Sequence, residues 1–178
     1  MKLNTPNKLT LLRVIMIPLF ILALYAGQDK STYKYIAFLI FALACLTDTL
    51  DGYIARSQNL VTNFGKFMDP LADKLLVCSA LVCFTEFGTL PSWVTIIIIA
   101  REFIISGFRL IASDKGVVIA ASYWGKFKTV SQMIMCFLLI LNIDKLAVVT
   151  FIFEILATAL TVISLVDYII KNKDVLKD

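Results

Sequence analysis

Six mostly apolar runs occupy most of this chain, and they restrict its possible folds more than any other feature. The runs cover residues 9–26, 33–50, 71–90, 92–112, 129–143 and 146–170. A helix of about 20 apolar residues crosses the hydrocarbon core of a bilayer. Of the 178 residues 60% are hydrophobic and 17% are charged, whereas a soluble domain carries about 25% charged residues. The runs therefore predict an all-α membrane protein with six transmembrane helices, forming one domain over residues 1–178.

The first run has an alternative interpretation. Lys2, Lys8 and an apolar stretch that ends near Ala26 resemble a secretory signal peptide. Arg13 interrupts this stretch and Pro18 lies within it, so we favour a helix that is retained in the mature protein. We expect the residues before Arg13 to lie along the membrane surface as an N-terminal juxtamembrane segment.

Basic residues are divided unevenly between the two sides of the predicted bundle. Thirteen of the 17 lie at the N-terminus, after the second run, between the fourth and fifth runs, and in the C-terminal tail. The alternate connections hold Lys30, Lys34 and Lys145, and Arg101 lies inside the fourth run. Because basic loops stay in the cytoplasm, we expect a multi-pass protein of the cell membrane with both termini cytoplasmic. The net charge of +4 suits anionic headgroups or phosphate esters, and little water-facing surface remains for nucleic acid.

Two residue types narrow the possible chemistry. The chain has no histidine, which excludes a histidine triad, metal ligand or general base, so acid–base chemistry falls to Asp, Glu or Lys. The cysteines lie inside apolar runs without the spacing of a metal site. We expect them to be buried free thiols rather than disulfides or zinc ligands. They are Cys45, Cys78, Cys83 and Cys136.

Residues 48–73, DTLDGYIARSQNLVTNFGKFMDPLAD, gather four aspartates in an otherwise apolar chain. Asp48 and Asp51 are three residues apart, and Asp69 and Asp73 are four apart, so each pair shares one face of a helix. Asp69 followed by Pro70 is typical of a helix start, because aspartate caps and proline suits the first turn. Two helix ends at the cytoplasmic boundary can therefore direct four carboxylates at one point.

Four adjacent carboxylates repel one another unless cations lie between them. Two divalent ions would cancel their charge, and a set of oxygen ligands suits Mg²⁺ or Mn²⁺. In the plainer alternative, these aspartates are solvated loop and cap residues at the membrane boundary. Gly52 and Gly65 leave room for a bulky ligand, and Arg56 can donate to phosphate, so we favour a ligand site.

The whole segment reads D-x2-D-G-x2-A-R-x8-G-x3-D-x3-D. It resembles the signature of the CDP-alcohol phosphatidyltransferases and matches each of the eight fixed positions. These are Asp48, Asp51, Gly52, Ala55, Arg56, Gly65, Asp69 and Asp73. The six predicted spans and the cytoplasmic site agree with that family, so the resemblance covers essentially the whole chain. It implies that Asp48, Asp51 and Asp69 bind two metal ions, and that Asp73 contacts metal and acts as general base on the acceptor alcohol.

The resemblance also implies contacts with the lipid-linked nucleotide CDP-diacylglycerol. Gly52 and Arg56 match positions that hold its CDP part, and Thr62 matches another nucleotide contact. The N-terminal TPNKLT resembles the segment that closes over the nucleotide, with Asn7 and Thr10 as the candidate contacts. A homodimer is likewise implied by the family.

Two further stretches carry cations that can bind a phosphorylated acceptor. In AREFIISGFR, Arg101 and Arg109 are separated by about 80° of helix rotation and can face one cavity. WGKFKT adds Lys126 and Lys128, and several cations together can cradle a phosphate. Alternatively, Arg101 pairs with an aspartate of the metal site, and the other three are anchors at the membrane boundary.

DPLADK, REFIISGFR and GKFKT together resemble the branch of the family whose acceptor is glycerol 3-phosphate. The resemblance implies that Arg101, Arg109, Lys126 and Lys128 bind its phosphate, and that the products are phosphatidylglycerol phosphate and CMP. A sibling enzyme using inositol phosphate, serine or phosphatidylglycerol is the nearest alternative. A cation transporter is an alternative from another class, but it should place its acids near the bilayer midplane, whereas these acids are predicted at one edge. An inactive scaffold homologue is a further alternative, but it would not need Asp73. Glu154, inside the last run, has no assigned role.

Overall fold

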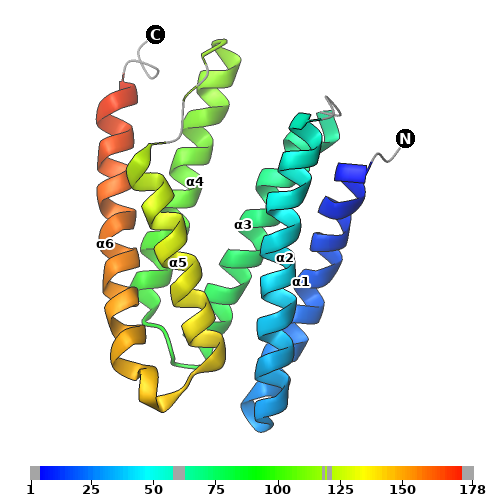
Figure 1. Ribbon diagram of the computed structural model, residues 1–178. Helices are drawn as coiled ribbons and strands as arrows, with labels where there is room; N and C mark the ends of the chain where they lie inside the picture. Colours follow the sequence, from blue (N-terminus) through cyan, green and yellow to red (C-terminus); the bar gives the residue numbers. More distant parts are fainter. Residues whose placement is uncertain (1–4, 58–62, 118, 120–121, 174–178) are drawn as a thin grey trace. The chain divides into compact units, whose positions relative to one another are not determined.

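The computed structural model describes residues 5–57, 63–117, 119 and 122–173, and their side chains except those of residues 5–6, 48–57, 63–67 and 69–70. These parts of the chain are all-α, as predicted, and each apolar run falls mostly within its own helix. The elements are α1 (Thr5–Asp29), α2 (Ser31–Ser57), α3 (Asn63–Glu86), α4 (Ser92–Asp114), α5 (Tyr123–Leu141), the 3-10 helix η1 (Asp144–Leu146) and α6 (Ala147–Asn172) (Figure 1).

The helices form two compact units. Unit 1 ends at Cys83 and unit 2 begins at Phe84, so most of α3 belongs to unit 1 and its last residues belong to unit 2. Each unit is described by itself below. A single domain over residues 1–178 stays a prediction.

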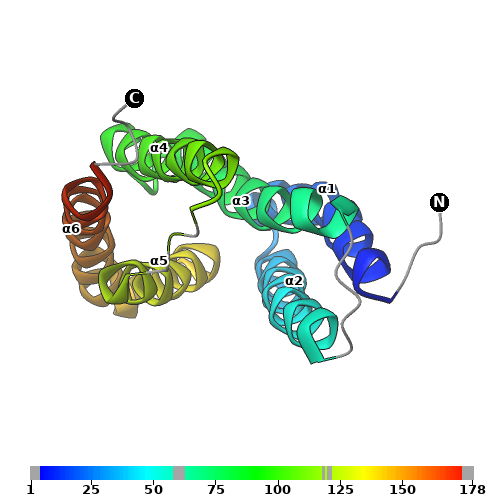
Figure 2. The ribbon, with the colours of Figure 1, turned by 90° about the horizontal axis from the view of Figure 1, so that it is seen from above.

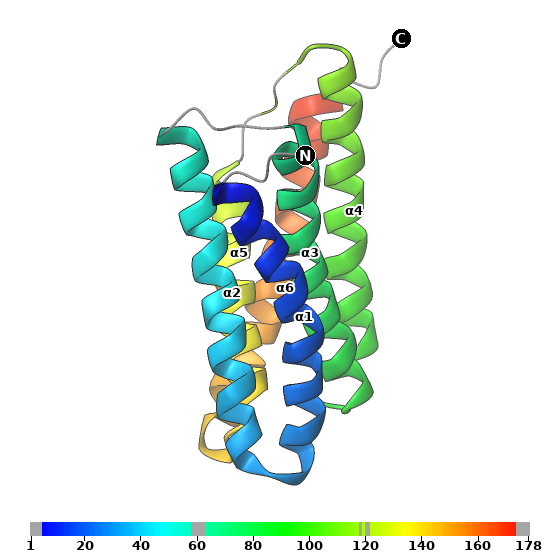
Figure 3. The same ribbon diagram turned by 90° about the vertical axis from the view of Figure 1, so that its right-hand side faces the viewer.

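In unit 1, α1 and α2 form an antiparallel hairpin whose connection is Lys30 alone (Figure 3). The helices approach closely at the turn because Gly27 has no side chain. A Cβ atom there would lie 3.1 Å from Cγ and 3.2 Å from the backbone nitrogen of Lys34. Seven residues further from the turn on each helix, the rings of Phe20 and Phe41 pack with their centroids 5.3 Å apart. These two pairs define the register of the hairpin.

The third helix does not start where the sequence predicted. We expected Asp69 and Pro70 to begin it, but α3 begins six residues earlier, at Asn63, so that prediction is wrong. A proline inside a helix removes one backbone hydrogen bond, yet helical pairing of all other backbone groups is favoured where water is scarce. The first helix likewise continues through Pro18.

In unit 2, α6 packs against both α4 and α5 (Figure 2). The hydroxyl groups of Thr85 and Thr95, 2.7 Å apart, tie the end of α3 to α4. The ring of Phe108 on α4 packs edge-on against that of Tyr168 on α6, with centroids 6.1 Å apart. The core of this unit consists of buried side chains from all three helices, including Val94, Ile98, Ile105, Met135, Cys136, Leu139 and Ala157.

Local signals explain where the helices of unit 2 begin and end. The Ser122 side chain accepts a hydrogen bond from the Gly125 backbone N–H at 3.1 Å and caps the start of α5. Asn142, in the left-handed conformation with φ 44°, ends α5, and Gly116, with φ 71°, follows the end of α4. These caps hold the first turn of α5, which carries part of the candidate site.

Among the described residues, three segments are long and apolar enough to cross a membrane: Asn7–Asp29, Tyr123–Leu141 and Asp144–Asn172. Large apolar side chains such as Leu39 and Phe151 are exposed on the helices, and such a surface suits lipid. These observations support the prediction of a membrane protein. The number of six spans and the juxtamembrane segment stay predictions, and α1 itself runs unbroken from Thr5 to Asp29.

Candidate active site

The four aspartates of the motif lie toward the same end of two antiparallel helices in unit 1, near the last turns of α2 and the first turns of α3 (Figure 1). At a rise of about 1.5 Å per residue, Asp51 lies about 9 Å before the end of α2 and Asp69 about 9 Å after the start of α3. Asp48 and Asp73 lie about 14 and 15 Å from the same two ends. The four backbone positions are therefore at similar depths, as a shared carboxylate site requires.

Asp73 is the aspartate of this motif whose side chain the structure describes, and it is half-buried on α3. A half-buried carboxylate can accept a proton from a bound alcohol while staying close to the water boundary. The other assignments in the motif stay predictions, because they fall outside the described side chains or, for Thr62, outside the described residues altogether. They concern Asp48, Asp51, Gly52, Arg56, Thr62 and Asp69.

A stripe of buried polar residues on α1 lies at the same end of unit 1. Asn7, Thr10 and Arg13 follow one another at intervals of three residues and are 3%, 0% and 0% exposed. Continuing the hairpin register by seven residues brings Arg13 level with Asp48, and Thr10 level with Asp51. The structure thus places the two predicted nucleotide contacts of the N-terminal segment beside the motif-bearing part of α2.

Sequence reasoning treated Arg13 only as an interruption of an apolar run and missed it as a candidate site residue. Its Nε donates a hydrogen bond to the Ala44 carbonyl at 3.3 Å, one helical turn before Asp48 on α2. The same carbonyl accepts the Thr47 hydroxyl at 2.8 Å. A signal was available in the sequence, since a charged residue inside an apolar span usually faces a polar interior.

Two of the four predicted acceptor-site cations come together in unit 2. Arg101 of α4 and Lys128 of α5 both donate to Oε1 of Glu102, with Arg101 Nη1 at 3.0 Å. The side chains of Arg101, Lys128 and Glu102 are 11%, 4% and 16% exposed. The result is a largely buried cluster of two cations and one anion with a formal charge of +1, which we call the Glu102 cluster.

The Arg101 guanidinium makes hydrogen bonds to residues of α4 and α6 and lies close to α5. Besides the contact with Glu102, its Nε donates to the Ser164 hydroxyl of α6 at 3.2 Å, and Ser164 in turn donates to the Thr161 carbonyl at 3.0 Å. Its Nη2 lies against the first turn of α5, where a Cβ atom added to Gly125 would be 3.4 Å away. These contacts orient the guanidinium.

Arg109 and Lys126 take no part in the described contacts of the Glu102 cluster, and both are exposed. Lys126 Nζ lies 5.3 Å from the centroid of the Tyr123 ring. Their assignment to the acceptor phosphate stays a prediction. Glu102 and Ser164 were not predicted as site residues. Glu102 follows Arg101 directly in sequence, but no local pattern links Glu102 to Lys128 or Ser164 to Arg101.

The cysteines are free thiols as predicted, but only two of the four are buried. All four are free thiols; Cys83 and Cys136 are buried, and Cys45 and Cys78 are half-buried. They offer no disulfide to the fold.

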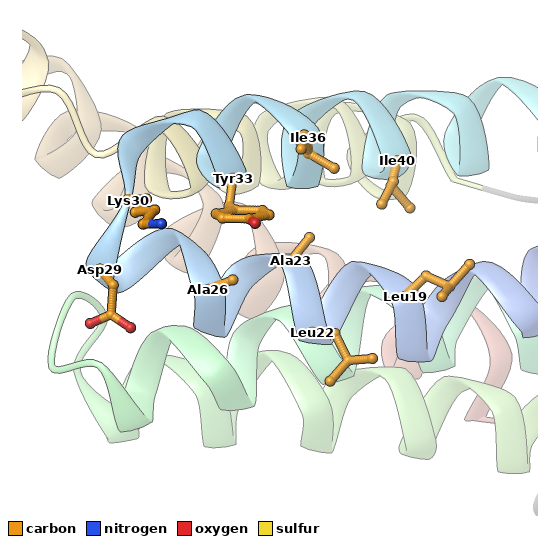
Figure 4. A pocket seen from close by; sticks show the side chains of 9 residues that line it. All are labelled: Leu19, Leu22, Ala23, Ala26, Asp29, Lys30, Tyr33, Ile36 and Ile40. Atoms are coloured by element: carbon orange, nitrogen blue, oxygen red, sulfur yellow. The ribbon is translucent and has the colours of Figure 1, made fainter.

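A shallow apolar hollow lies beside the turn of the α1–α2 hairpin (Figure 4). Its lining includes Ala23, Tyr33 and Ile36, with Asp29 and Lys30 at the turn. This is the end of the hairpin opposite to Arg13 and the aspartates. Its lining is mostly hydrocarbon, and its two charged residues both lie at the turn.

Comparison with known proteins identifies relatives of nearly full length. The family model described as "CDP-alcohol phosphatidyltransferase" matches residues 3–163. The CDP-diacylglycerol–glycerol-3-phosphate 3-phosphatidyltransferase of Bacillus subtilis (strain 168) is 42% identical over 98% of this chain and 97% of its own length. The protein of the same name from Haemophilus influenzae is 40% identical over 100% of this chain and 98% of its own. The "probable phosphatidylglycerophosphate synthase" of Mycobacterium tuberculosis (strain H37Rv) is 44% identical over 93% of this chain and 80% of its own.

Proposed function

We propose that this chain, which belongs to the CDP-alcohol phosphatidyltransferase family, transfers the phosphatidyl group of CDP-diacylglycerol to glycerol 3-phosphate, giving phosphatidylglycerol phosphate and CMP. The observation that carries the proposal is its likeness to two proteins named for this reaction, at 40% and 42% identity over 98% or more of this chain. The chain also retains every fixed position of the aspartate motif.

The donor set on α2 and α3 fits two divalent ions. Four carboxylates at similar depth offer hard oxygen ligands, which suit Mg²⁺ or Mn²⁺. We propose that Asp48, Asp51, Asp69 and Asp73 hold these ions. When bound, such a metal pair supplies charge neutralisation at the pyrophosphate and stabilises the entering and leaving oxygens.

The residues of the chain supply the proton transfer and the binding of the nucleotide. The hydroxyl oxygen of the acceptor forms a bond to the lipid phosphorus, the bond from that phosphorus to CMP breaks, and the Asp73 carboxylate takes the hydroxyl proton. Gly52 leaves room for the CDP part, and Arg56 and Thr62 donate to it. Asn7 and Thr10, buried beside the end of α2, complete the nucleotide contacts.

The Glu102 cluster supports a phosphorylated acceptor. Two cationic side chains meet there at one carboxylate oxygen, and both are largely buried. A phosphate dianion suits such a pair, because Arg and Lys donate strong charge-assisted hydrogen bonds to its oxygens. We assign Arg101 and Lys128 to the phosphate directly, and Arg109 and Lys126 to its approach from water.

The proposal includes the membrane setting. Six helices span the cell membrane, both termini and the aspartates face the cytoplasm, and two copies form a homodimer. This setting suits the chemistry, since the acyl chains stay in lipid while the headgroup and the soluble acceptor meet at the boundary. The distribution of basic residues supports this orientation.

A purified assay tests the activity. The protein in detergent is given CDP-diacylglycerol with glycerol 3-phosphate, inositol phosphate, serine or phosphatidylglycerol, each with and without Mg²⁺ or Mn²⁺, and CMP release is followed. We expect metal-dependent CMP release with glycerol 3-phosphate. Exclusive use of another acceptor would overturn the assignment of glycerol 3-phosphate.

A further inference from the structure

We infer that Glu102 is a positioning residue of the acceptor-phosphate site, where its carboxylate holds the Arg101 guanidinium and the Lys128 ammonium together and sets the net charge that the acceptor meets. The inference rests on the proposed function, because it takes Arg101 and Lys128 as the groups that bind the acceptor phosphate. It concerns a residue next to Arg101 in sequence whose role arises from a contact with α5, 26 residues away.

The first observation is that Arg101 and Lys128 share one acceptor atom. One oxygen atom, Glu102 Oε1, accepts from both Arg101 Nη1 and Lys128 Nζ. Two like charges on one acceptor lie close together, and in a largely buried place their repulsion is only weakly screened. The carboxylate between them offsets this repulsion. Without it, the two cations would move apart and no longer present a joint binding surface.

The second observation concerns the remaining N–H donors of Arg101. The described contacts of Arg101 engage Nε with Ser164 and Nη1 with Glu102. A guanidinium has five N–H donors, so those on Nη2, which lies against the first turn of α5, remain for a ligand. Arg101 can therefore bind a phosphate without giving up the contacts with Glu102 and Ser164 that hold it in place.

The third observation concerns charge. It distinguishes a Glu102 that positions the two cations from a Glu102 that competes with phosphate for them. With Glu102 ionised, the cluster has a formal charge of +1; with a neutral residue in its place, the charge would be +2. If Glu102 only competed with phosphate for the two cations, its neutralisation would tighten acceptor binding. If Glu102 positions them, its neutralisation weakens acceptor binding despite the greater positive charge. The sign of the change decides between the two roles.

The experiment measures steady-state kinetics of Glu102→Gln in the full-length protein, varying each substrate in turn. Glutamine keeps the shape and one acceptor oxygen but removes the charge. We expect the KM for glycerol 3-phosphate to rise about tenfold, which is the typical size of one lost charge-assisted hydrogen bond. The KM for CDP-diacylglycerol should stay within about twofold, because we assign the nucleotide to unit 1 residues.

Two further variants complete the test. Asp167→Asn removes a different ion pair in the same unit, the 2.6 Å contact between Lys171 and Asp167 on α6, and should leave both KM values unchanged. Glu102→Asp keeps the charge on a shorter side chain and should raise the KM for glycerol 3-phosphate less than Glu102→Gln does. If Glu102→Gln does not fold, Glu102→Asp decides the matter, and a KM for glycerol 3-phosphate equal to that of the wild type would overturn the inference.

Each outcome has a defined meaning. An unchanged or lower KM for glycerol 3-phosphate in folded Glu102→Gln overturns the inference while leaving the proposed function intact. Equal rises in both KM values, with a lowered unfolding temperature, also overturn it, because they indicate general distortion. A wild-type protein that releases no CMP with glycerol 3-phosphate overturns the proposed function and the inference together.

Discussion

Unit 1 and unit 2 both place charged side chains within helices that are mostly apolar, but they arrange these charges differently. In unit 1, four aspartates occupy the last turns of α2 and the first turns of α3, near the level of the buried Arg13. In unit 2, two cations share the carboxylate of Glu102, and the cluster keeps a formal charge of +1. Under the proposed function, the positive charge that binds the acceptor comes from protein side chains, whereas the positive charge that balances the aspartates would come from bound metal ions.

Removal of divalent ions should give the largest effect and tests this contrast directly. Chelation by EDTA should reduce CMP release below detection, because the carboxylates of unit 1 would repel the pyrophosphate without metal. Added Mg²⁺ or Mn²⁺ should restore the rate, measured with saturating substrates. Full activity after chelation and dialysis would contradict the role given to the aspartates.

Asp73→Asn should lower the turnover by about a thousandfold, because asparagine cannot take the acceptor proton. Binding of CDP-diacylglycerol, measured by its effect on the unfolding temperature, should change little. Glu86→Gln, an exposed acid at the end of the same helix, serves as the control and should keep full activity. A fully active Asp73→Asn variant would remove Asp73 as the base.

Replacing each of the two lysines of α5 should change the KM for glycerol 3-phosphate by different amounts, which tests whether burial in unit 2 decides acceptor binding. Lys128→Ala removes a buried partner of Glu102 and should raise the KM for glycerol 3-phosphate by about ten- to a hundredfold. Lys126→Ala removes an exposed charge and should raise it by at most about threefold. Equal effects of the two variants would show that burial in the cluster does not decide acceptor binding.

Arg13→Gln should have a smaller effect on activity. The variant loses a fully buried positive charge and the hydrogen bond to the Ala44 carbonyl, one turn from Asp48. We expect turnover to fall by about tenfold, the size of one charged hydrogen bond, with a lower unfolding temperature. Lys8→Gln, an exposed position on the same helix, is the matched control. Wild-type activity in Arg13→Gln would show that unit 1 does not use this charge.

Reductant should have the smallest effect of all. The four cysteines are free thiols, so dithiothreitol should change neither the CMP-release rate nor the unfolding temperature by a measurable amount. A lower unfolding temperature after reduction would contradict this, because it would indicate that the protein contains a disulfide.

The helices could be predicted from sequence because apolar length is a local property, and in lipid a helix satisfies its own backbone groups. Their ends could not be read as reliably. Asp69 and Pro70 resemble a helix start, yet α3 begins at Asn63, because one lost hydrogen bond does not outweigh the pairing of its neighbours. Hydropathy placed the fifth apolar run at residues 129–143, whereas α5 begins at Tyr123, where Ser122 caps it.

The candidate site likewise has one part that could be predicted from the sequence and one part that could not. The aspartate motif is a pattern of fixed spacing over 26 residues, so it is visible without a fold. The contacts of Arg101 with Ser164, 63 residues away, and of Lys128 with Glu102, 26 residues away, arise from packing between helices. No spacing rule within one helix could have paired these residues.

The size of the side chain at position 125 can alter the proposed acceptor site without any change of charge. A Cβ atom there would meet Arg101 Nη2 at 3.4 Å and the Ser122 hydroxyl at 3.5 Å, which are ordinary contact distances. Alanine therefore fits, whereas a larger side chain would have to push the guanidinium or loosen the cap of α5. A graded series of side-chain volumes at this one position would therefore displace the guanidinium by increasing amounts without removing any ionised group.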